Sequence, residues 1–557
     1  METTVVLVDD GTSKLPENIR HHILSFLEHE EAVKTSVLSK AWLSTWRTRP
    51  DLQFIRKRVV KRSPDDTTIQ ATLEKKGNDF VNSINTTLTR YHENKYGIET
   101  LKIYLPMIAS VTPDHVNTWF QIAVENGVKI LSIGLNNFIV LPETVFRAKS
   151  LVKLWLGKFQ LNSQVIQIIR CHGLRKLSLI QVNIDEVMLQ RIISSCPSIE
   201  YLKILLSVGF ANIKVTNLQK LKQFKIQFRE KRSGFVELEG PSLEEFCYWN
   251  CINTDEDETQ FFPCSLQMYA CKNLKRLRLR EIAITEGFFS GIAENFPLLE
   301  ELTVQYCDHL QNIKISSQSI KRIYLDTNWE LKEACIDVPS IVRFKYSGDS
   351  IPLFSFTAPS GPCIFEIDLQ CQDWDILEIS WFSELKELLT KLNKSEISLD
   401  IQFPATLDGF TEDEMRNNAI FPVPQVQKLS IGFSDRDYLD AAYLALDSIF
   451  WTCRPKTIVQ SWHYDKVLNN NDLVKVLFEM LMLRRNQQQT KFWQQELKAV
   501  KLEMFKEGQR VRFPELLLDL ETFLKSMKTE GSSSCTPLVF DLEWETAKQA
   551  TRKHETT

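Results

Sequence analysis

The sequence predicts an α/β solenoid, with parallel strands on one side and helices on the other, preceded by a small all-helical module. Three observations predict this class. An apolar template recurs through the middle of the chain, the segment before it has apolar residues at helical spacing, and a chain of 557 residues is too long for one compact core. We therefore expect an elongated repeat array after a short N-terminal unit.

The segment from Lys14 to Phe54 predicts three short helices. Pro16 suits a helical first turn, because the N–H that proline lacks is not needed there. Ser39 is a candidate cap for a third helix that carries Trp42 and Trp46 on one face. About 40 residues cannot enclose so many apolar side chains, so we expect an apolar surface that a partner protein covers. The alternative is a helical cap that buries the same residues internally.

This segment resembles the F-box, whose pattern is Leu-Pro, an Ile-Leu pair, an Ala-Val pair, then Val-Leu-Ser-Lys-x-Trp and a later Trp. It departs from the pattern at Ala41, where arginine is common. The resemblance implies contact with a Skp-type adaptor, and through the adaptor with a cullin scaffold. The residues that it implies for adaptor contact are Leu15, Pro16, Ile23, Leu24, Leu27, Val33, Val37, Leu38, Trp42 and Trp46.

From Ile98 onward, a template of apolar, x, x, apolar, x, apolar recurs. Its spacing is close to the roughly 20 to 29 residues of a leucine-rich repeat, in which the alternating segment forms one strand per turn. Between the strands, Met188 to Cys196 and Phe288 to Phe296 predict outer helices. The first positions of the template are Ile98, Val128, Leu151, Leu174, Ile199, Leu221, Leu243, Leu274, Leu299, Ile320 and Ile341.

Stacked repeats place their strands side by side, so the residues between the inward-facing positions line up as a column on the concave side. That column is Trp155, Ser178, Lys203, Lys225, Cys247, Arg278, Thr303, Tyr324 and Lys345. Neighbouring positions add Lys153, Lys176, Arg276, Arg280, Arg322 and Arg343.

This column predicts a target-binding surface that leans basic, which favours an acidic or phosphorylated target segment or a polyanionic small molecule. The alternative is that exposed Lys and Arg only fill a solvated strand face. The residues that we expect to contact a target protein are Trp155, Lys203, Lys225, Arg278, Tyr324 and Lys345.

After Ile431 the strand template fades, and Asp437–Phe450, Asp472–Arg484 and Glu515–Met527 predict amphipathic helices that close the array. The segments Trp451–Lys456, Trp493–Phe505 and Val511–Phe513 resemble the tail of plant F-box and leucine-rich-repeat proteins, of the kind called FBD-like. The expected domains are a flexible N-terminus at 1–12, the F-box at 13–54, a linker at 55–96, the leucine-rich-repeat solenoid at 97–435, and a helical C-terminal cap and tail at 436–557.

The composition argues against several partners. The formal net charge of −4 gives no global positive field for nucleic acid or an anionic membrane. The N-terminus lacks the pattern of a signal peptide, and no run approaches the roughly 18 apolar residues of a membrane span. We therefore expect the nucleus or the cytoplasm or both, where the 12 cysteines stay reduced.

No phosphate-binding loop, dinucleotide-binding glycine motif, nucleophile elbow or paired zinc-hydrolase histidines occur in the sequence. Four cysteines (Cys247, Cys251, Cys264 and Cys271) lack the usual short spacing of zinc ligands, so we expect no metal, cofactor or catalytic residue. The resemblance implies a non-catalytic, substrate-recognition subunit of a Skp-cullin-F-box ubiquitin ligase. The alternative is an adaptor-bound leucine-rich-repeat scaffold without a degradative role.

Overall fold

The computed structural model describes two compact units, Met1–Ala283 and Ile284–Thr557, called here the first and second unit. The described residues are 14–27, 29–55, 67–105, 111–163, 168–229, 234–250, 264–282, 284–307, 310–327, 331–371, 377–392, 395–404, 423–433, 439–460, 476–483, 492–506, 509–512 and 538–545.

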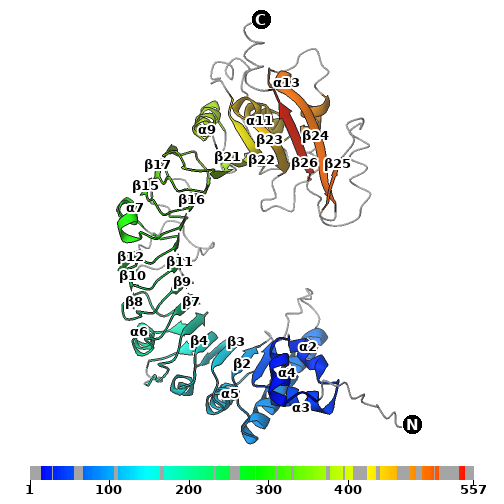
Figure 1. Ribbon diagram of the computed structural model, residues 1–557, viewed down its shortest axis with the longest axis vertical. Helices are drawn as coiled ribbons and strands as arrows, with labels where there is room; N and C mark the ends of the chain where they lie inside the picture. Colours follow the sequence, from blue (N-terminus) through cyan, green and yellow to red (C-terminus); the bar gives the residue numbers. More distant parts are fainter. Residues whose placement is uncertain are drawn as a thin grey trace, which may run out of the picture. The chain divides into compact units, whose positions relative to one another are not determined.

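The first unit begins with three short helices, α1 (Glu17–Ser25), α2 (His29–Thr35) and α3 (Lys40–Thr48), which confirm the helical module that the sequence predicts (Figure 1). Ser39 caps α3 as expected, because its Oγ accepts a 3.2 Å hydrogen bond from the backbone N–H of Trp42. Helices α1 and α2 both contact α3, so the three form one packed module.

The segment expected as a linker, 55–96, is instead mostly helix α4 (Thr67–Glu93), which has 27 residues. The physical reason is a buried stripe at helical spacing, in which each side chain is at most 2% exposed. Helix α4 packs against α5 (Pro113–Glu125), which belongs to the first repeats. The stripe consists of Val81, Ile84, Leu88 and Tyr91.

The main sheet of the first unit is parallel throughout, and each strand pairs with the next in the order given (Figure 1). Its strands are β1 (Asp51–Ile55), β2 (Thr100–Tyr104), β3 (Ile130–Val140), β4 (Lys153–Leu161), β5 (Lys176–Ile180), β7 (Tyr201–Ser207), β9 (Gln223–Phe228), β11 (Glu245–Trp249) and β13 (Arg276–Arg280). This ladder confirms the predicted parallel-strand solenoid.

The other side of the first unit is built from helices and short strands. The helices are α5, η2 (Glu143–Arg147) and α6 (Glu186–Ser195). Strand β6 (Asn183–Ile184) pairs with β4, and β8 (Ile213–Val215), β10 (Gly234–Glu239) and β12 (Cys264–Tyr269) form a second parallel sheet. Inward-facing apolar residues such as Leu177 and Leu179 fill the core between the two sides, each at most 1% exposed.

The second unit repeats this plan. Its parallel strands are β14 (Glu301–Gln305), β16 (Arg322–Thr327), β18 (Arg343–Gly348), β20 (Ile364–Gln370), β21 (Glu396–Phe403), β22 (Gln425–Phe433) and β23 (Arg454–Gln460). Beside them lie α7 (Glu286–Ser290), α8 (Ile292–Asn295), the small sheet β15 (Asn312–Ser316), β17 (Glu333–Asp337) and β19 (Leu353–Phe356), and then α9 (Ile379–Lys391) and α11 (Leu439–Thr452).

The C-terminal region corrects the expected helical cap at 436–557. Strand β23 extends the parallel ladder beyond residue 435, and the strands after it are antiparallel: β26 (Leu538–Trp544) pairs with β23 and with β24 (Leu497–Lys506), which pairs with β25 (Gln509–Arg512). The physical reason is that Phe540 and Leu542 alternate along β26 and supply one buried strand face, while Val539 is buried on the opposite face.

Helices and strands share the described residues of this region about equally. Helix α11 confirms the helix expected near 437–450. The described part of the helix expected at 472–484 is also helical, with α-helix at 476–478 followed by the π-helix η4 (Glu479–Leu483), and α13 (Phe492–Glu496) is a further short helix. The helix expected at 515–527 lies outside the described residues. Within the described part of the chain, no helix is long and apolar enough to cross a membrane.

Candidate functional site

The N-terminal module has its own small core, made by Leu24, Ala32 and Trp42, each only 4–5% exposed. Leu27 and Trp46 are partly buried and pack against this core. Leu24 and Trp42 therefore expose little surface to a partner, and their contact with an adaptor stays a prediction. Their role is to hold α1, α2 and α3 together, and Leu27 and Trp46 mainly support them.

Other apolar side chains of the same module face solvent. Among the predicted adaptor contacts, Pro16 is exposed and Leu15 is half-buried. Exposed fractions are 36% for Ile23, 38% for Val33, 74% for Val37 and 47% for Leu38. Two further residues, Ile19 at 42% and Phe26 at 76%, were not among the predicted contacts. We call Ile19, Ile23, Phe26, Val33, Val37 and Leu38 the module's apolar residues.

The sequence contained a signal for the two missed residues. Ile19, Ile23 and Phe26 follow one another at i, i+4 and i+7, which places them on one face of α1. The His22 ring packs edge-on against Phe26, with 4.8 Å between ring centroids. The apolar face of α1 is therefore broader than the resemblance alone implies. Contact of any of these residues with an adaptor stays a prediction.

The module is joined directly to the repeat sheet. Only Arg49 and Pro50 separate α3 from β1, and the Pro50 carbonyl oxygen accepts hydrogen bonds from the N–H groups of Glu99 (2.9 Å) and Thr100 (3.2 Å). The hydroxyl of Tyr91 on α4 donates a 2.7 Å hydrogen bond to the Arg49 carbonyl oxygen. These bonds fix the chain where it passes from the helical module into the first strand.

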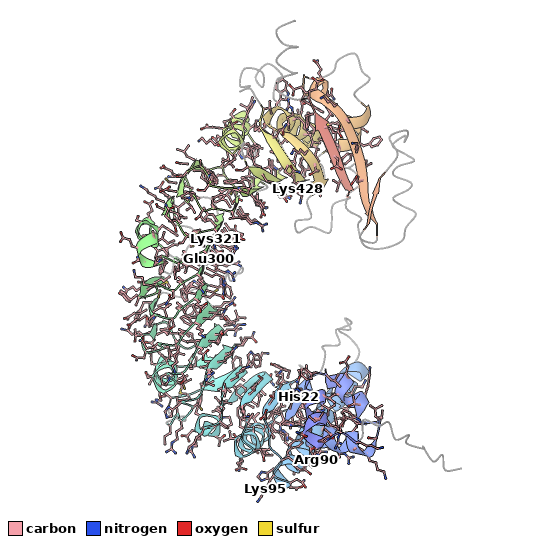
Figure 2. The ribbon with its side chains drawn as sticks, viewed as in Figure 1. His22, Arg90, Lys95, Glu300, Lys321 and Lys428 are labelled. Carbon is pink, nitrogen blue, oxygen red and sulfur yellow. The ribbon has the colours of Figure 1, made fainter. Side chains whose placement is uncertain are left out.

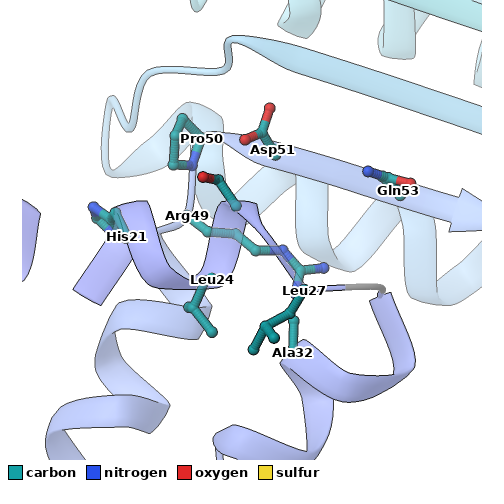
Figure 3. A pocket seen from close by; sticks show the side chains of 9 residues that line it. His21, Leu24, Leu27, Ala32, Arg49, Pro50, Asp51 and Gln53 are labelled. Carbon is teal, nitrogen blue, oxygen red and sulfur yellow. The ribbon is translucent and has the colours of Figure 1, made fainter. Parts of the chain in front are cut away.

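A pocket lies at this junction (Figure 3). The Arg49 side chain reaches into it between the strand β1 and the module, beside Leu27 and Ala32. Arg49 is 8% exposed, and burial lowers the pKa of its guanidinium, whereas Tyr91 and Asp51 raise it. Because the lining comes from both the module and β1, the pocket marks where the module seats on the sheet.

The strand side of the main sheet in the first unit, called here the first strand face, carries the predicted column in register. Trp155, Ser178, Lys203, Lys225, Cys247 and Arg278 are successive partners across β4, β5, β7, β9, β11 and β13. This confirms their alignment, although Cys247 is fully buried and offers no surface. Target contact by Trp155, Lys203, Lys225 and Arg278 stays a prediction.

A buried carboxylate organises the cations at one end of this face. Glu245 is 5% exposed, and its oxygens lie 2.8 Å from Lys225 Nζ, 3.0 Å from Arg276 Nη2 and 3.8 Å from Arg278 Nη1. Burial alone would raise the pKa of Glu245, but hydrogen bonds from Lys225, Arg276 and Gln223 outweigh it and lower the pKa to about 2. Sequence reasoning missed Glu245, because no motif distinguishes it from other strand residues.

An aromatic pair occupies another part of the first strand face. The rings of Tyr104 and Trp155 pack edge-on, with 5.1 Å between centroids. The Trp155 ring lies over Gly134 and Gly157, where an added Cβ would approach it to 3.0 Å and 2.8 Å. The two glycines are register partners, so together they make the space that the half-buried indole fills.

The strand side of the second unit differs in charge. Tyr324 pairs in register with Thr303 and with Lys345, as predicted, and Lys345 pairs with Glu366. At the outward-facing positions of β14, β16, β18, β20, β21 and β22, the cations are Arg322, Arg343, Lys345 and Lys428. The carboxylates are Glu301, Asp326, Glu366, Asp368, Glu396 and Asp400.

With four cations and six carboxylates, this second face as a whole does not lean basic. The predicted column ends at Lys345, where three cations face two carboxylates, and the later strands β20, β21 and β22 add four carboxylates and one cation. Two of the cations are paired: Arg322 lies 3.4 Å from Glu301, and Arg343 lies 3.6 Å from Glu366. Nearby, Lys321 Nζ lies 3.2 Å from Glu300 Oε1 (Figure 2). Target contact by Tyr324 and Lys345 stays a prediction.

The cysteines whose side chains are described are free thiols, and all but Cys335 are buried. Burial raises the pKa of Cys271, and of Cys247 in the same way, to about 11. Cys251, another of the four cysteines that lack zinc-ligand spacing, lies outside the described residues. Within the ranges described above, no cluster of three or more His, Cys, Asp or Glu could hold a metal ion.

Comparison with known proteins matches two segments of the chain to known domain families. Residues 12–54 match the F-box domain, and residues 116–262 match the LRR repeats of the FBD-associated F-box protein At5g56370. The first match spans α1 to α3 and most of β1, and the second lies within the first unit. Both therefore coincide with the module and the strand ladder described above.

Individual relatives from Arabidopsis thaliana agree. F-box/LRR-repeat protein 25 is 28% identical over 232 residues, covering 41% of this chain and 79% of its own. F-box/LRR-repeat protein At4g14103 is 26% identical over 356 residues, covering 62% and 82%. A relative named for an F-box, an FBD and an LRR repeat is 29% identical over 222 residues, covering 38% of this chain and 47% of its own, so the match spans about half of that relative. This chain thus carries an F-box followed by leucine-rich repeats of the type found in FBD-associated F-box proteins, and it resembles the plant F-box/LRR-repeat proteins.

Proposed function

We propose that this chain is the substrate-recognition subunit of a Skp-cullin-F-box ubiquitin ligase, acting in the nucleus or cytoplasm. The observation that carries the proposal is the set of exposed apolar residues on the module that matches the F-box domain, up to 76% exposed at Phe26. Exposed apolar side chains at this density on a small module favour coverage by another protein. The occupant that the F-box match favours is a Skp-type adaptor, which would link the chain to a cullin.

The mechanism is proximity. The adaptor holds the F-box and the repeats hold the target, so the target's lysines stay close to a ubiquitin-loaded enzyme at high effective concentration. The short junction supports this arrangement, because Arg49 and Pro50 are tied to α4 and to the segment before β2 by hydrogen bonds. The other subunits supply the bond-forming chemistry, and in this proposal no residue of this chain is catalytic.

The alternative is an adaptor-bound scaffold that does not direct ubiquitin transfer. To distinguish the recognition role from the scaffold role, the chain is assembled with a Skp-type adaptor, a cullin and the RING subunit of the ligase. The complex is then added to cell extract with tagged ubiquitin. The control is a Phe26→Glu, Val37→Glu variant, whose substitutions lie at exposed positions and should leave the fold intact.

If proteins of the extract receive tagged ubiquitin with the unaltered chain but not with the variant, the result supports the recognition role. If the chain binds the adaptor but no protein is modified in this way, the result favours the scaffold role. If the folded, unaltered chain binds no Skp-type adaptor, both versions of the proposal fail.

A further inference from the structure

The first strand face carries an excess of positive charge. Across the three outward positions of its nine strands, the cationic side chains are Lys102, Lys153, Lys176, Lys203, Lys225, Arg276, Arg278 and Arg280. The carboxylates at the same positions are Asp51 and Glu245. Eight cations against two carboxylates leave a formal charge of +6, although the whole chain carries −4.

Internal ion pairs neutralise this charge only at one end. Lys225, Arg276 and Arg278 share the single carboxylate of Glu245. The four lysines on β2, β4, β5 and β7 have no carboxylate within 4.0 Å among the residues that the structure describes; Lys176 instead lies 4.0 Å above the Tyr201 ring. These lysines are Lys102, Lys153, Lys176 and Lys203. No carboxylate of the described residues neutralises these four lysines, so they can attract an approaching anion.

An apolar row runs beside the lysines. The last outward positions of β2, β3, β4, β5 and β7 are register partners and carry no charge. The Trp155 ring fills the space over the two glycines of this row and packs on Tyr104, so the surface there is aromatic and aliphatic. The row consists of Tyr104, Gly134, Gly157, Ile180 and Leu205.

We propose that the first strand face binds an extended, acidic segment of the target protein, in which carboxylates alternate with apolar side chains. Alternate side chains of an extended chain point to opposite sides. A segment that crosses the strands between the lysines and the apolar row would thus direct its carboxylates toward the lysines. Its apolar side chains would point toward the apolar row. Neighbouring strands lie about 4.8 Å apart, so lysines on successive strands fit a run of carboxylates better than one phosphate. This inference rests on the proposed function, because it takes this face as the target site.

Fluorescence anisotropy of labelled peptides with the full chain tests the inference. The probe alternates Glu and Val over about ten residues, which span roughly 33 Å when extended. One comparison peptide has the same composition in a Glu block and a Val block, and another replaces Glu by Lys. We expect the alternating acidic peptide to bind most tightly, the Lys peptide not to bind, and added salt to weaken binding. Equal binding of the two Glu peptides would overturn the alternating arrangement, and no binding of either would overturn the acidic segment.

Charge-reversal variants locate the site. Lys153→Glu with Lys203→Glu removes two attractions and adds two repulsions, so we expect about tenfold weaker binding. The matched control is Lys149→Glu with Lys220→Glu, which makes the same charge change at exposed positions outside the strands. An equal loss of peptide affinity in the two double variants would overturn the assignment of the site to the first strand face.

The same samples are tested for adaptor association, which keeps the two proposals separate. Adaptor binding without peptide binding overturns only the inference about the first strand face. Peptide binding without adaptor binding overturns the proposed ligase function and leaves the peptide site standing.

Discussion

The Tyr91 hydroxyl donates a 2.7 Å hydrogen bond to the carbonyl oxygen of Arg49, across 42 residues of sequence. Tyr91 is fully buried on α4, and Arg49 is the first residue after the F-box helix α3. Burial raises the pKa of Tyr91 to about 12, so the phenol keeps its proton and remains a donor at neutral pH. One hydrogen bond thus ties the long helix to the point where the F-box meets the repeats.

Tyr91→Phe should therefore destabilise the first unit. The substitution removes the donor and leaves a buried carbonyl oxygen without it, which costs about 1–3 kcal/mol. Urea unfolding at neutral pH measures the change. Tyr96→Phe is the control, because Tyr96 packs edge-on against Tyr91 but is only half-buried. Equal stability of the two variants would contradict a structural role for this bond.

Helix α4 should be part of the folded core and not a tether. Leu88 is fully buried, so Leu88→Ala should lower the free energy of unfolding by about 2–5 kcal/mol. Thr86→Ala, at an exposed position of the same helix, should change it by less than about 0.5 kcal/mol. Thermal unfolding of both variants measures the difference. A stable Leu88→Ala variant would mean that the segment is a linker after all.

The stability that Glu245 contributes should depend on pH. The ordinary carboxyl pKa of 4.5 falls to about 2 in the folded chain. A lowered folded pKa gives stability that is present above the unfolded pKa and is lost as pH falls through the folded value. Glu245→Gln should thus cost about 3 kcal/mol at pH 7, and the difference from the unaltered chain should shrink between about pH 4.5 and 2.

Urea unfolding along a pH series measures this difference. Glu244→Gln is the neighbouring control, since its side chain is 43% exposed and pairs with Lys275 at the surface. A Glu245→Gln cost that stays constant down to pH 2 would rule out the ionised network.

The buried cysteines should react slowly. Burial raises the pKa of Cys171 and of Cys196 to about 12, so almost no thiolate is present at neutral pH. Cys335 is half-exposed. With N-ethylmaleimide on the native chain, peptide mass spectrometry should find Cys335 modified well before Cys171. Modification of Cys171 at the same rate would contradict its burial in the repeat core.

Much of the fold could be predicted because its signals are periodic. The template that begins at Leu174 buries Leu177 and Leu179 and leaves Ser178 in the outward column, and the same register holds on the neighbouring strands. Periodicity does not show which side of a short helix becomes internal. Leu24 and Trp42 therefore could not be separated from exposed neighbours such as Val37 until three helices had packed together.

Other features depend on contacts distant in sequence. The linker prediction failed although Ile84, Leu88 and Tyr91 have helical spacing, because the sequence does not show what that stripe packs against. The antiparallel C-terminal strands pair across long gaps, as β23 does with β26. The Glu245 network needs cations from two other strands, so no local pattern reveals it. The fold class was thus more predictable than the site.

The most direct test of the central claim is the affinity of the intact chain for a purified Skp-type adaptor, measured by isothermal titration calorimetry. Val37→Glu places a charge at a 74% exposed F-box position, and Val187→Glu makes the same change at a 61% exposed position on α6. We expect the intact chain and the Val187→Glu variant to bind alike, and Val37→Glu to bind at least about tenfold more weakly. A folded chain that does not bind, or equal binding by both variants, would contradict the account.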